Sequence, residues 1–174
     1  MPENVPMKLV MDVHLQGDSA LVAAVAFDDW AAFEGTKNYS LRIDRVEKPV
    51  KGELDLRELP WLLQLLQSNS LQPEVIVFDG FVHLDAQETP GLGRHLHDTL
   101  GARSAVIGVS KTDFKDTPEQ FEVYREEETG PLIITCAGID LGAAKARVRT
   151  MHGRKRVPTL MKLAARIAKG NAPA

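Results

Sequence analysis

The sequence is poor in cysteine and in long apolar runs, and each shortage excludes a class of protein. Its single cysteine, Cys136, has no second cysteine to pair with, so neither an internal disulfide framework nor a cysteine-rich zinc site can form. No apolar run approaches the length that crosses a bilayer, and residues 1–4 lack the basic flank of a signal peptide. We therefore expect a cytoplasmic protein without a membrane partner.

Acidic residues are absent after Asp140, although the chain holds 24 of them against 21 Lys and Arg. Subtracting the nine basic residues beyond Asp140 from 21 leaves twelve for the first 140 positions. Two interpretations stay open: a solvated helix face that docks on an acidic body, and a strip that contacts phosphate groups. A phosphodiesterase needs both signs of charge, because carboxylates hold metal and basic residues hold the nucleic-acid backbone. The nine are Lys145, Arg147, Arg149, Arg154, Lys155, Arg156, Lys162, Arg166 and Lys169.

The first third of the chain predicts three strands. Met7–Val13 is apolar and rich in β-formers, whereas the alanine-rich Ser19–Phe27 is strand or helix by periodicity alone. The short turn signal at 17–18 favours a hairpin between these two segments. Tyr39–Val46 alternates apolar and polar residues, which is typical of a strand with one solvated face. Together the three could form an antiparallel meander.

The middle of the chain predicts alternating helices and buried strands. Asp55 is a plausible N-cap, and Glu58, three residues on, is its capping-box partner at the start of an apolar helix. Val75–Phe78 is short and fully apolar, as expected of a buried parallel strand. A helix at Gly91–Leu100 and another buried strand at Ala105–Val109 follow.

The last third predicts a small β excursion and then helices. Phe121–Tyr124 and Leu132–Thr135 are expected to pair around a turn at 126–130, after a polar loop at 115–118. The basic segment 141–169 contains two helical stretches, separated at Gly153 and Pro158. The length of 174 residues suits one domain, 1–174, and the order of elements predicts an α/β mixed sheet, an antiparallel meander plus parallel strands, with helices on both faces.

Three carboxylates occupy positions that indicate chemistry. Asp12 lies near the end of an apolar strand, where an ionised carboxylate is costly without a partner. Asp79 follows the buried strand at the end where open α/β sheets bind ligands, and Glu58 lies in the first turn of the preceding helix. A shared divalent cation would compensate all three charges, and Mg²⁺ prefers such oxygen ligands. Two such ions would activate a water molecule and stabilise a leaving oxygen.

Each of these acids also has an ordinary structural alternative. Glu58 could simply complete a helix cap, Asp79 with Gly80 could form only a turn, and Asp12 could pair with a nearby lysine. Composition and spacing alone name no substrate, so the substrate class has to come from elsewhere.

The stretch VIVFDGFVHLD at 75–85, followed by PGLGRHLHDTLGARSAVIGVSK at 90–111, resembles the pattern of the endonuclease V family. That family has a strand ending in Asp-Gly, a histidine shortly after it, a Gly-Leu-x-x-His-Leu helix and a strand ending in Ile-Gly-Val-x-Lys. Upstream, MDVHLQGDSALVAAVAF resembles the family's first hairpin, and GELDLRELP resembles the segment that carries its catalytic glutamate. The likeness covers most of residues 7–169. The matching residues at its centre are Asp79, Gly80, His83, Gly91, Leu92, His95, Leu96, Ile107, Gly108, Val109 and Lys111.

The resemblance implies a ribonuclease-H-like fold and an endonuclease dependent on Mg²⁺ or Mn²⁺. The expected reaction is cleavage of a phosphodiester bond near deaminated bases, chiefly inosine, in DNA or RNA, as in DNA repair. Asp12, Glu58 and Asp79 would be the catalytic acids and metal ligands. Lys111 would position phosphate or water, although it could equally be a solvated loop lysine.

The resemblance also implies substrate contacts outside the acids. Gly80 and His83 would lie at the base pocket, and His95 would cap its helix or contact backbone. A lone histidine is more often structural, so that alternative stays open for both histidines. In the basic segment, the run Arg154, Lys155 and Arg156 would contact substrate phosphates.

Two departures from the family pattern bear on activity. Where the family has a metal-site histidine after a glycine, this chain has Ile139 after Gly138, and Asp140 could substitute as a ligand or serve only as an N-cap. Where the family has a Pro-Tyr-x-Pro-Gly wedge, residues 48–52 read Lys-Pro-Val-Lys-Gly and carry no aromatic residue. The alternative to an active endonuclease is therefore a nucleic-acid-binding domain of the same fold with little or no catalysis. A third alternative is an α/β domain unrelated to nucleic acid, and the sequence fixes no oligomeric state.

Overall fold

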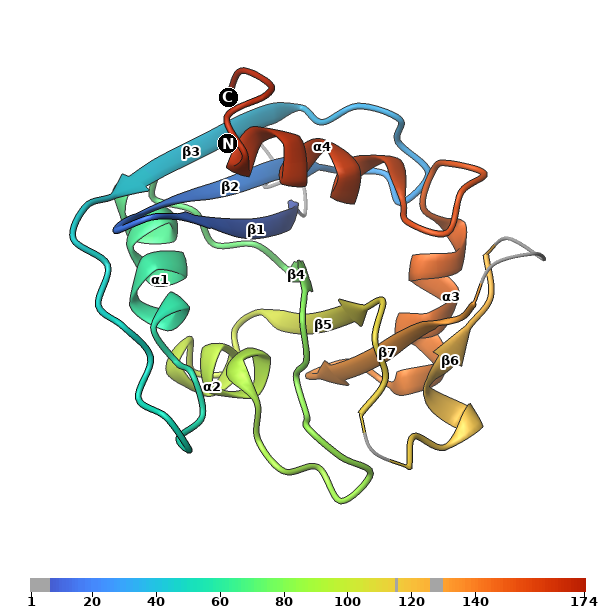
Figure 1. Cartoon of the computed structure of the whole chain (residues 1–174). Helices are drawn as coiled ribbons and strands as arrows, with labels where there is room; N and C mark the ends of the chain where they lie inside the picture. Colours follow the sequence, from blue (N-terminus) through green and yellow to red (C-terminus); the bar gives the residue numbers. More distant parts are fainter. Residues whose placement is uncertain (1–6, 115, 126–129) are drawn as a thin grey trace.

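The computed structural model describes residues 7–114, 116–125 and 130–174, which build one seven-stranded sheet with helices on both faces (Figure 1). The strand order is β3-β2-β1-β4-β5-β7-β6. The expected α/β fold with a mixed sheet is confirmed. The strands are β1 (Lys8–Gln16), β2 (Ser19–Phe27), β3 (Lys37–Ile43), β4 (Val75–Asp79), β5 (Ala105–Ser110), β6 (Glu122–Val123) and β7 (Leu132–Ala137), and the helices are α1 (Glu58–Ser68), α2 (Leu92–Thr99), α3 (Leu141–Thr150) and α4 (Thr159–Ala168).

The first three strands form the predicted antiparallel meander. β2 pairs with both β1 and β3, so the alanine-rich segment is a strand rather than a helix. It is buried along nearly its whole length, because α1 and α4 cover its two faces, and small alanine side chains fit between these layers. β3 ends at Ile43, before the predicted Val46, because Arg45 adopts a left-handed backbone with a φ of 58°.

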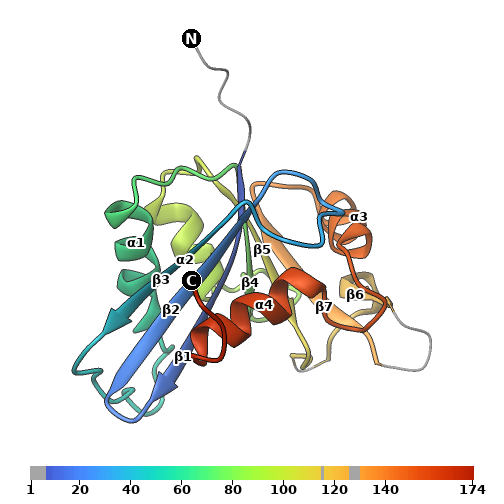
Figure 2. The same cartoon turned by 90° about the horizontal axis from the view of Figure 1, so that it is seen from above.

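The centre of the sheet is parallel, as the apolar runs predicted for β4. β4 pairs in parallel with β1 on one side and with β5 on the other. Figure 2 shows α1 and α2 on one side of the sheet and α3 and α4 on the other. Alternate residues of each strand feed the two cores: Leu9 and Met11 pack beneath α1 and α2, whereas Val10 packs beneath α3 and α4.

The last part of the sheet reverses direction. β7 runs antiparallel to β5, and β6 pairs with β7, which confirms the predicted β excursion. Of its predicted turn, residues 126–129 lie outside the described residues, as does residue 115 of the predicted polar loop. Both predicted C-terminal helices are present as α3 and α4. Among the residues described, no helix combines the length and the apolar content that a membrane span needs.

Gly108 in β5 allows the chain after β4 to pack directly on the sheet. A Cβ atom at Gly108 would lie 2.5 Å from the carbonyl oxygen of Gly80 and 2.8 Å from the hydroxyl oxygen of Thr135. That hydroxyl is buried and accepts a hydrogen bond from the backbone N–H of Val82 at 2.8 Å. The absence of a side chain at Gly108 therefore fixes the path of the chain immediately after Asp79.

We predict that Gly108→Ala lowers the free energy of unfolding by about 2 kcal/mol or more, because backbone atoms have to move away from the new methyl group. The matched control is Gly142→Ala in α3, where the nearest atom to the new Cβ is 3.7 Å away. That variant is expected to gain about 0.5–1 kcal/mol from its higher helix propensity. Urea unfolding of both variants checks the pair, and a Gly108→Ala protein as stable as wild type would contradict the close approach.

Candidate active site

Two carboxylates meet where the parallel ladder between β1 and β4 ends, Asp12 within β1 and Asp79 at the end of β4. The last residue pair in the β1–β4 ladder is Met11 with Phe78, so the next residues, Asp12 and Asp79, come side by side. Both line one cavity of about 380 Å³ beneath α4. Asp12 lies two residues after Val10 and therefore points to the same, α4 side of the sheet. The parallel register thus brings together two of the three predicted acids.

Glu58 reaches the same end of the sheet from the opposite face. It is the first residue of α1, and the predicted capping box is wrong, because the residue before the helix is Arg57 and no side chain caps it. Asp55 instead accepts hydrogen bonds from the Arg57 guanidinium at 2.9 and 2.8 Å. The half-buried Glu58 carboxylate is left without a hydrogen bond or ion pair to any described residue.

The three carboxylates disfavour one another's charged forms. Burial, and next the negative charge of Asp79, raises the pKa of Asp12 to about 6, while the Val13 N–H bonded at 2.9 Å opposes this rise. Burial, and next the charge of Asp12, raises the pKa of Glu58 to about 7, with a smaller contribution from Asp79. Burial also raises the pKa of Asp79 against the lowering effect of Lys111. All three acids therefore lie within electrostatic reach of one another.

The donor set fits a divalent cation at two of these acids rather than at all three. Asp12 and Asp79 supply paired oxygen ligands, and their like charges favour a bound cation. Over the ranges that the structure describes, however, no three His, Cys, Asp or Glu side chains are placed to hold one metal ion together. Glu58 lies beside the pair and outside its immediate ligand set. Mg²⁺ needs only one or two carboxylates, because water and substrate phosphate complete its shell.

Lys111 lies next to this pair, as predicted. It follows β5 directly and lines the same cavity as Asp12 and Asp79. Its positive charge lowers the pKa of both carboxyl groups against the effect of burial. Its exposed ammonium forms no hydrogen bond or ion pair with the described residues, so it is available to an anion.

The basic run 154–156 lies outside the cavity that holds the acids. None of Arg154, Lys155 and Arg156 lines the cavity of the acids. The Arg156 guanidinium donates hydrogen bonds to the backbone carbonyls of Lys111 at 2.8 Å and Pro131 at 2.7 Å. Arg156 therefore positions the segment that carries Lys111, and its role as a substrate-binding residue stays a prediction.

Three cations that line the cavity were not selected from the sequence. Lys162, Arg166 and Lys169 of α4 and its C-cap share the cavity with Asp12 and Asp79. Their spacing of four and three residues places them on one face of a helix, and this pattern was the signal that could have identified them. The basic tail therefore meets the acids through its last helix rather than through the loop before it.

The two histidines expected at a base pocket lie at α2, outside the cavity that holds the acids. Gly80 has a φ of 155°, and a Cβ there would lie 2.6 Å from the Phe78 ring. His83 is buried and lies 3.3 Å from a guanidinium nitrogen of Arg94, and burial lowers the pKa of its imidazole. His95 is half-buried in α2. Neither histidine lines the cavity with the acids, so the structure does not bring them together with Asp12 and Asp79.

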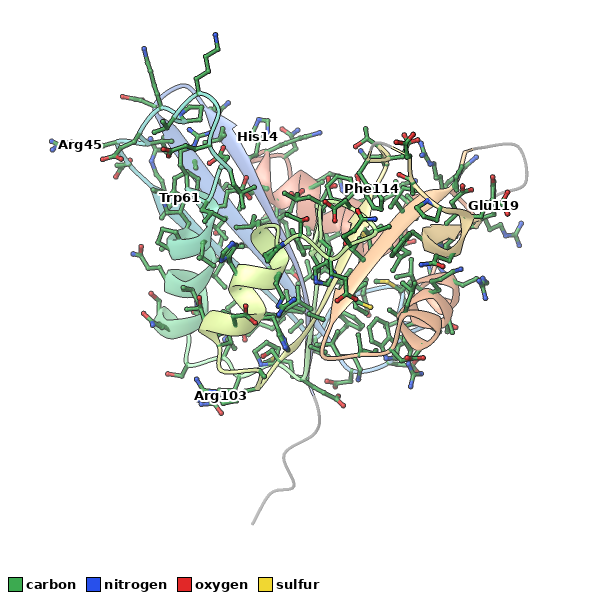
Figure 3. The ribbon with its side chains drawn as sticks, turned by 90° about the horizontal axis from the view of Figure 1, so that it is seen from below. His14, Arg45, Trp61, Arg103, Phe114 and Glu119 are labelled. Carbon is green, nitrogen blue, oxygen red and sulfur yellow. The ribbon has the colours of Figure 1, made fainter. Side chains whose placement is uncertain are left out.

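Asp140 is also separated from the other acids. β7 runs antiparallel to β5, with Ala137 opposite Val106. The chain therefore leaves β7 at the end of the sheet where β5 begins. Asp79 pairs with Val109 near the other end of β5. Figure 3 shows the two ends: His14 and Phe114 lie at one, and Arg103, just before β5, lies at the other. Asp140 precedes α3, and Ile139 packs against the core, so the predicted metal role of Asp140 is corrected.

Comparison with solved structures places the fold among endonuclease V proteins. The Bacillus subtilis endonuclease V structure matches with a TM-score of 0.77 and 21% identity over 95% of this chain and 80% of that one. A Ciona intestinalis endonuclease V, in complex with a 24mer DNA containing an inosine followed by a ribo-adenosine, matches with a TM-score of 0.77 and 17% identity over 95% and 85% of the chains. Human ENDOV matches with a TM-score of 0.72 and 19% identity over 95% and 84%.

No family model and no curated protein sequence matches the chain. The likeness is thus one of structure at low sequence identity. It confirms the ribonuclease-H-like fold that the resemblance at 75–111 implied.

We predict that Glu58→Gln stabilises the metal-free protein at about pH 8 by about 1–3 kcal/mol and has little effect at about pH 4. The folded state holds the Glu58 proton up to about pH 7, whereas the unfolded chain loses it near the ordinary glutamate pKa of 4.5. Wild-type stability therefore falls as pH rises through this window, and the glutamine variant lacks that loss. Urea unfolding in EDTA measures the difference.

The control for this experiment is Glu53→Gln, which changes an exposed glutamate just before the same helix. It is expected to shift stability by less than about 0.5 kcal/mol at either pH. A Glu58→Gln effect that stays constant between the two pH values would contradict the electrostatic coupling.

We predict that Arg156→Ala lowers the free energy of unfolding by about 2–3 kcal/mol, because two charge-assisted hydrogen bonds to carbonyls are lost. Arg154→Ala, an exposed neighbour of equal charge, is expected to change it by less than about 0.5 kcal/mol. Thermal unfolding compares the two. Equal effects would show that Arg156 has no special structural role.

Proposed function

We propose that this chain is a divalent-metal-dependent endonuclease that cleaves phosphodiester bonds near deaminated bases, chiefly inosine, in DNA or RNA. The observation that carries the proposal is that Asp12 and Asp79 lie side by side where the parallel β1–β4 ladder ends and line one cavity. Lys111 lines the same cavity and acts electrostatically on the pair, and Glu58 is electrostatically coupled to it from outside the cavity. Such a site on the fold of endonuclease V supports a nuclease-type reaction.

Asp12 and Asp79 would hold the Mg²⁺ or Mn²⁺ ion, with Glu58 beside them. When bound, the ion supplies charge for an attacking water molecule and for the leaving oxygen. The chain's own contribution is positional. Lys111 presents an unpaired ammonium to the substrate phosphate, and Arg156 holds the backbone of Lys111 through its carbonyl.

The choice of a deaminated base is supported by the neighbours rather than by the cavity. The Ciona endonuclease V structure holds DNA that contains inosine. In this chain Gly80 and His83 occupy the positions that match the family's Asp-Gly-containing motif. We therefore carry inosine recognition, and with it a role in DNA repair, as part of the proposal.

A weak or inactive nucleic-acid-binding domain of the same fold is the second candidate. It is favoured by one observation: across the described part of the chain, no three potential ligands are grouped to hold a metal ion. Ile139, which packs in the core where the family has a histidine, points the same way. On this alternative, nucleic acid binds with a strong dependence on salt and is not cut.

Cleavage of labelled inosine-containing DNA and RNA with Mg²⁺ or Mn²⁺ tests the proposal. We predict that wild type cuts at least one strand and that Asp79→Asn loses about a hundredfold or more in rate, because the cation site is broken. Asp140→Asn removes a carboxylate at the opposite end of the strands from Asp79 and is expected to retain the wild-type rate.

The outcomes separate the two candidates. Binding without cleavage by wild type supports the inactive domain. Cleavage that survives Asp79→Asn would contradict the proposed site. Cleavage lost in Asp140→Asn would contradict the separation of Asp140 from Asp12 and Asp79 at opposite ends of the sheet.

A further inference from the structure

The cavity beneath α4 is apolar inside and charged at its rim. Its volume is about 380 Å³, within the range of small-molecule sites. The buried side chains of Val10, Val109, Leu132 and Met161 line its interior, together with the half-buried Ala165 of α4. Such a lining packs against the apolar face of a planar group, and the polar edge of that group can meet the charged side chains of Asp12, Asp79 and Lys111, which line the same cavity.

The rim of the same cavity carries cations without partners. Lys162 and Arg166 lie one helical turn apart on α4, and both are exposed. Within the described chain neither side chain has a hydrogen bond or ion pair. Lys169 lies further along the same face, near enough to Asp12 to lower the pKa of that carboxyl group. An anionic group is therefore the complementary partner of this rim.

Few ligands combine these two properties. Inorganic phosphate would satisfy the rim and leave the interior unused, and an uncharged apolar molecule would leave the cations unused. A nucleotide carries a planar base with an apolar face and a phosphate on either side of its sugar. Charge complementarity and the position of the cavity, which is shared with Asp12 and Asp79, favour a nucleotide of a nucleic-acid strand.

We propose that this cavity is a nucleotide subsite of the substrate strand, in which one unstacked base enters the apolar interior and Lys162 and Arg166 bind backbone phosphate. The inference rests on the proposed function for its substrate class and names which surface the strand follows. The cavity lies under α4, whereas the buried His83 contacts Arg94 of α2. The subsite is therefore distinct from the base pocket expected around His83.

The phosphate half is tested by the salt dependence of binding. Binding of a short single-stranded DNA is measured by fluorescence anisotropy in EDTA at several salt concentrations. Lys162→Gln with Arg166→Gln is expected to reduce the slope of log K against log salt by about 1.4, or about 0.7 per lost contact. The charge-matched control is Arg103→Gln with Arg149→Gln, both exposed and outside the cavity, which should keep the wild-type slope.

The base half is tested by filling the cavity. Ala165→Leu should weaken binding of the strand by about 5- to 50-fold with an unchanged salt slope, because one base loses its packing site. An abasic strand of the same length should bind wild type and Ala165→Leu equally. Ala143→Leu on the exposed face of α3 is the matched control and should bind as wild type.

A comparison of two strands on the wild-type protein does not depend on whether a variant folds. Wild type should bind the normal strand about 5- to 50-fold more tightly than the abasic strand. Equal binding of the two strands, or a Lys162→Gln/Arg166→Gln slope equal to that of its control, would overturn the subsite. Because these measurements are made without metal, a chain that binds in this manner and never cuts would refute the endonuclease while the subsite stands.

Discussion

The parallel register of β1 and β4 is the constraint on which the site depends. It places Asp12 beside Asp79, so two like charges meet at the end of an otherwise apolar pair of strands. Burial raises the pKa of both carboxyl groups, and the negative charge of Asp79 adds to the rise at Asp12. A protein gains no stability from such a pair, and a site that attracts a cation accounts for it.

The C-terminal segment completes the site in two different ways. The loop before α4 is held to the body by hydrogen bonds. Arg156 donates to the carbonyls of Lys111 and Pro131, and Arg125 donates to the carbonyl of Gly153 at 3.0 Å. The last helix of the segment covers β1 and β2 and presents cations to the cavity of the acids. Both interpretations of the basic tail therefore apply, each to a different part: one part docks on the body, and the other faces the proposed substrate.

Periodicity, apolar runs and the turn signal at 17–18 were together enough to predict the strands, the helices and the pairing of the meander. The proximity of Asp12 and Asp79 was predicted from the position of both acids near the ends of apolar segments and from the family resemblance, whereas the parallel pairing of β1 with β4 was not predicted. Details set by tertiary contacts did not follow. Glu58 begins its helix without a cap because Asp55 pairs with Arg57 instead, and Asp140 is remote because β7 runs antiparallel to β5. No local pattern distinguishes these outcomes from their alternatives.

Glu58 lies outside the immediate ligand set of Asp12 and Asp79 but is electrostatically coupled to it. A half-buried carboxylate with a pKa of about 7 lies beside the pair, so a bound cation would change its charge as well as theirs. The most direct test of the account is the anomalous difference density of crystals soaked in Mn²⁺. The account predicts a peak between the carboxylates of Asp12 and Asp79. A saturating soak with no peak there, or a peak only at another site, would contradict it.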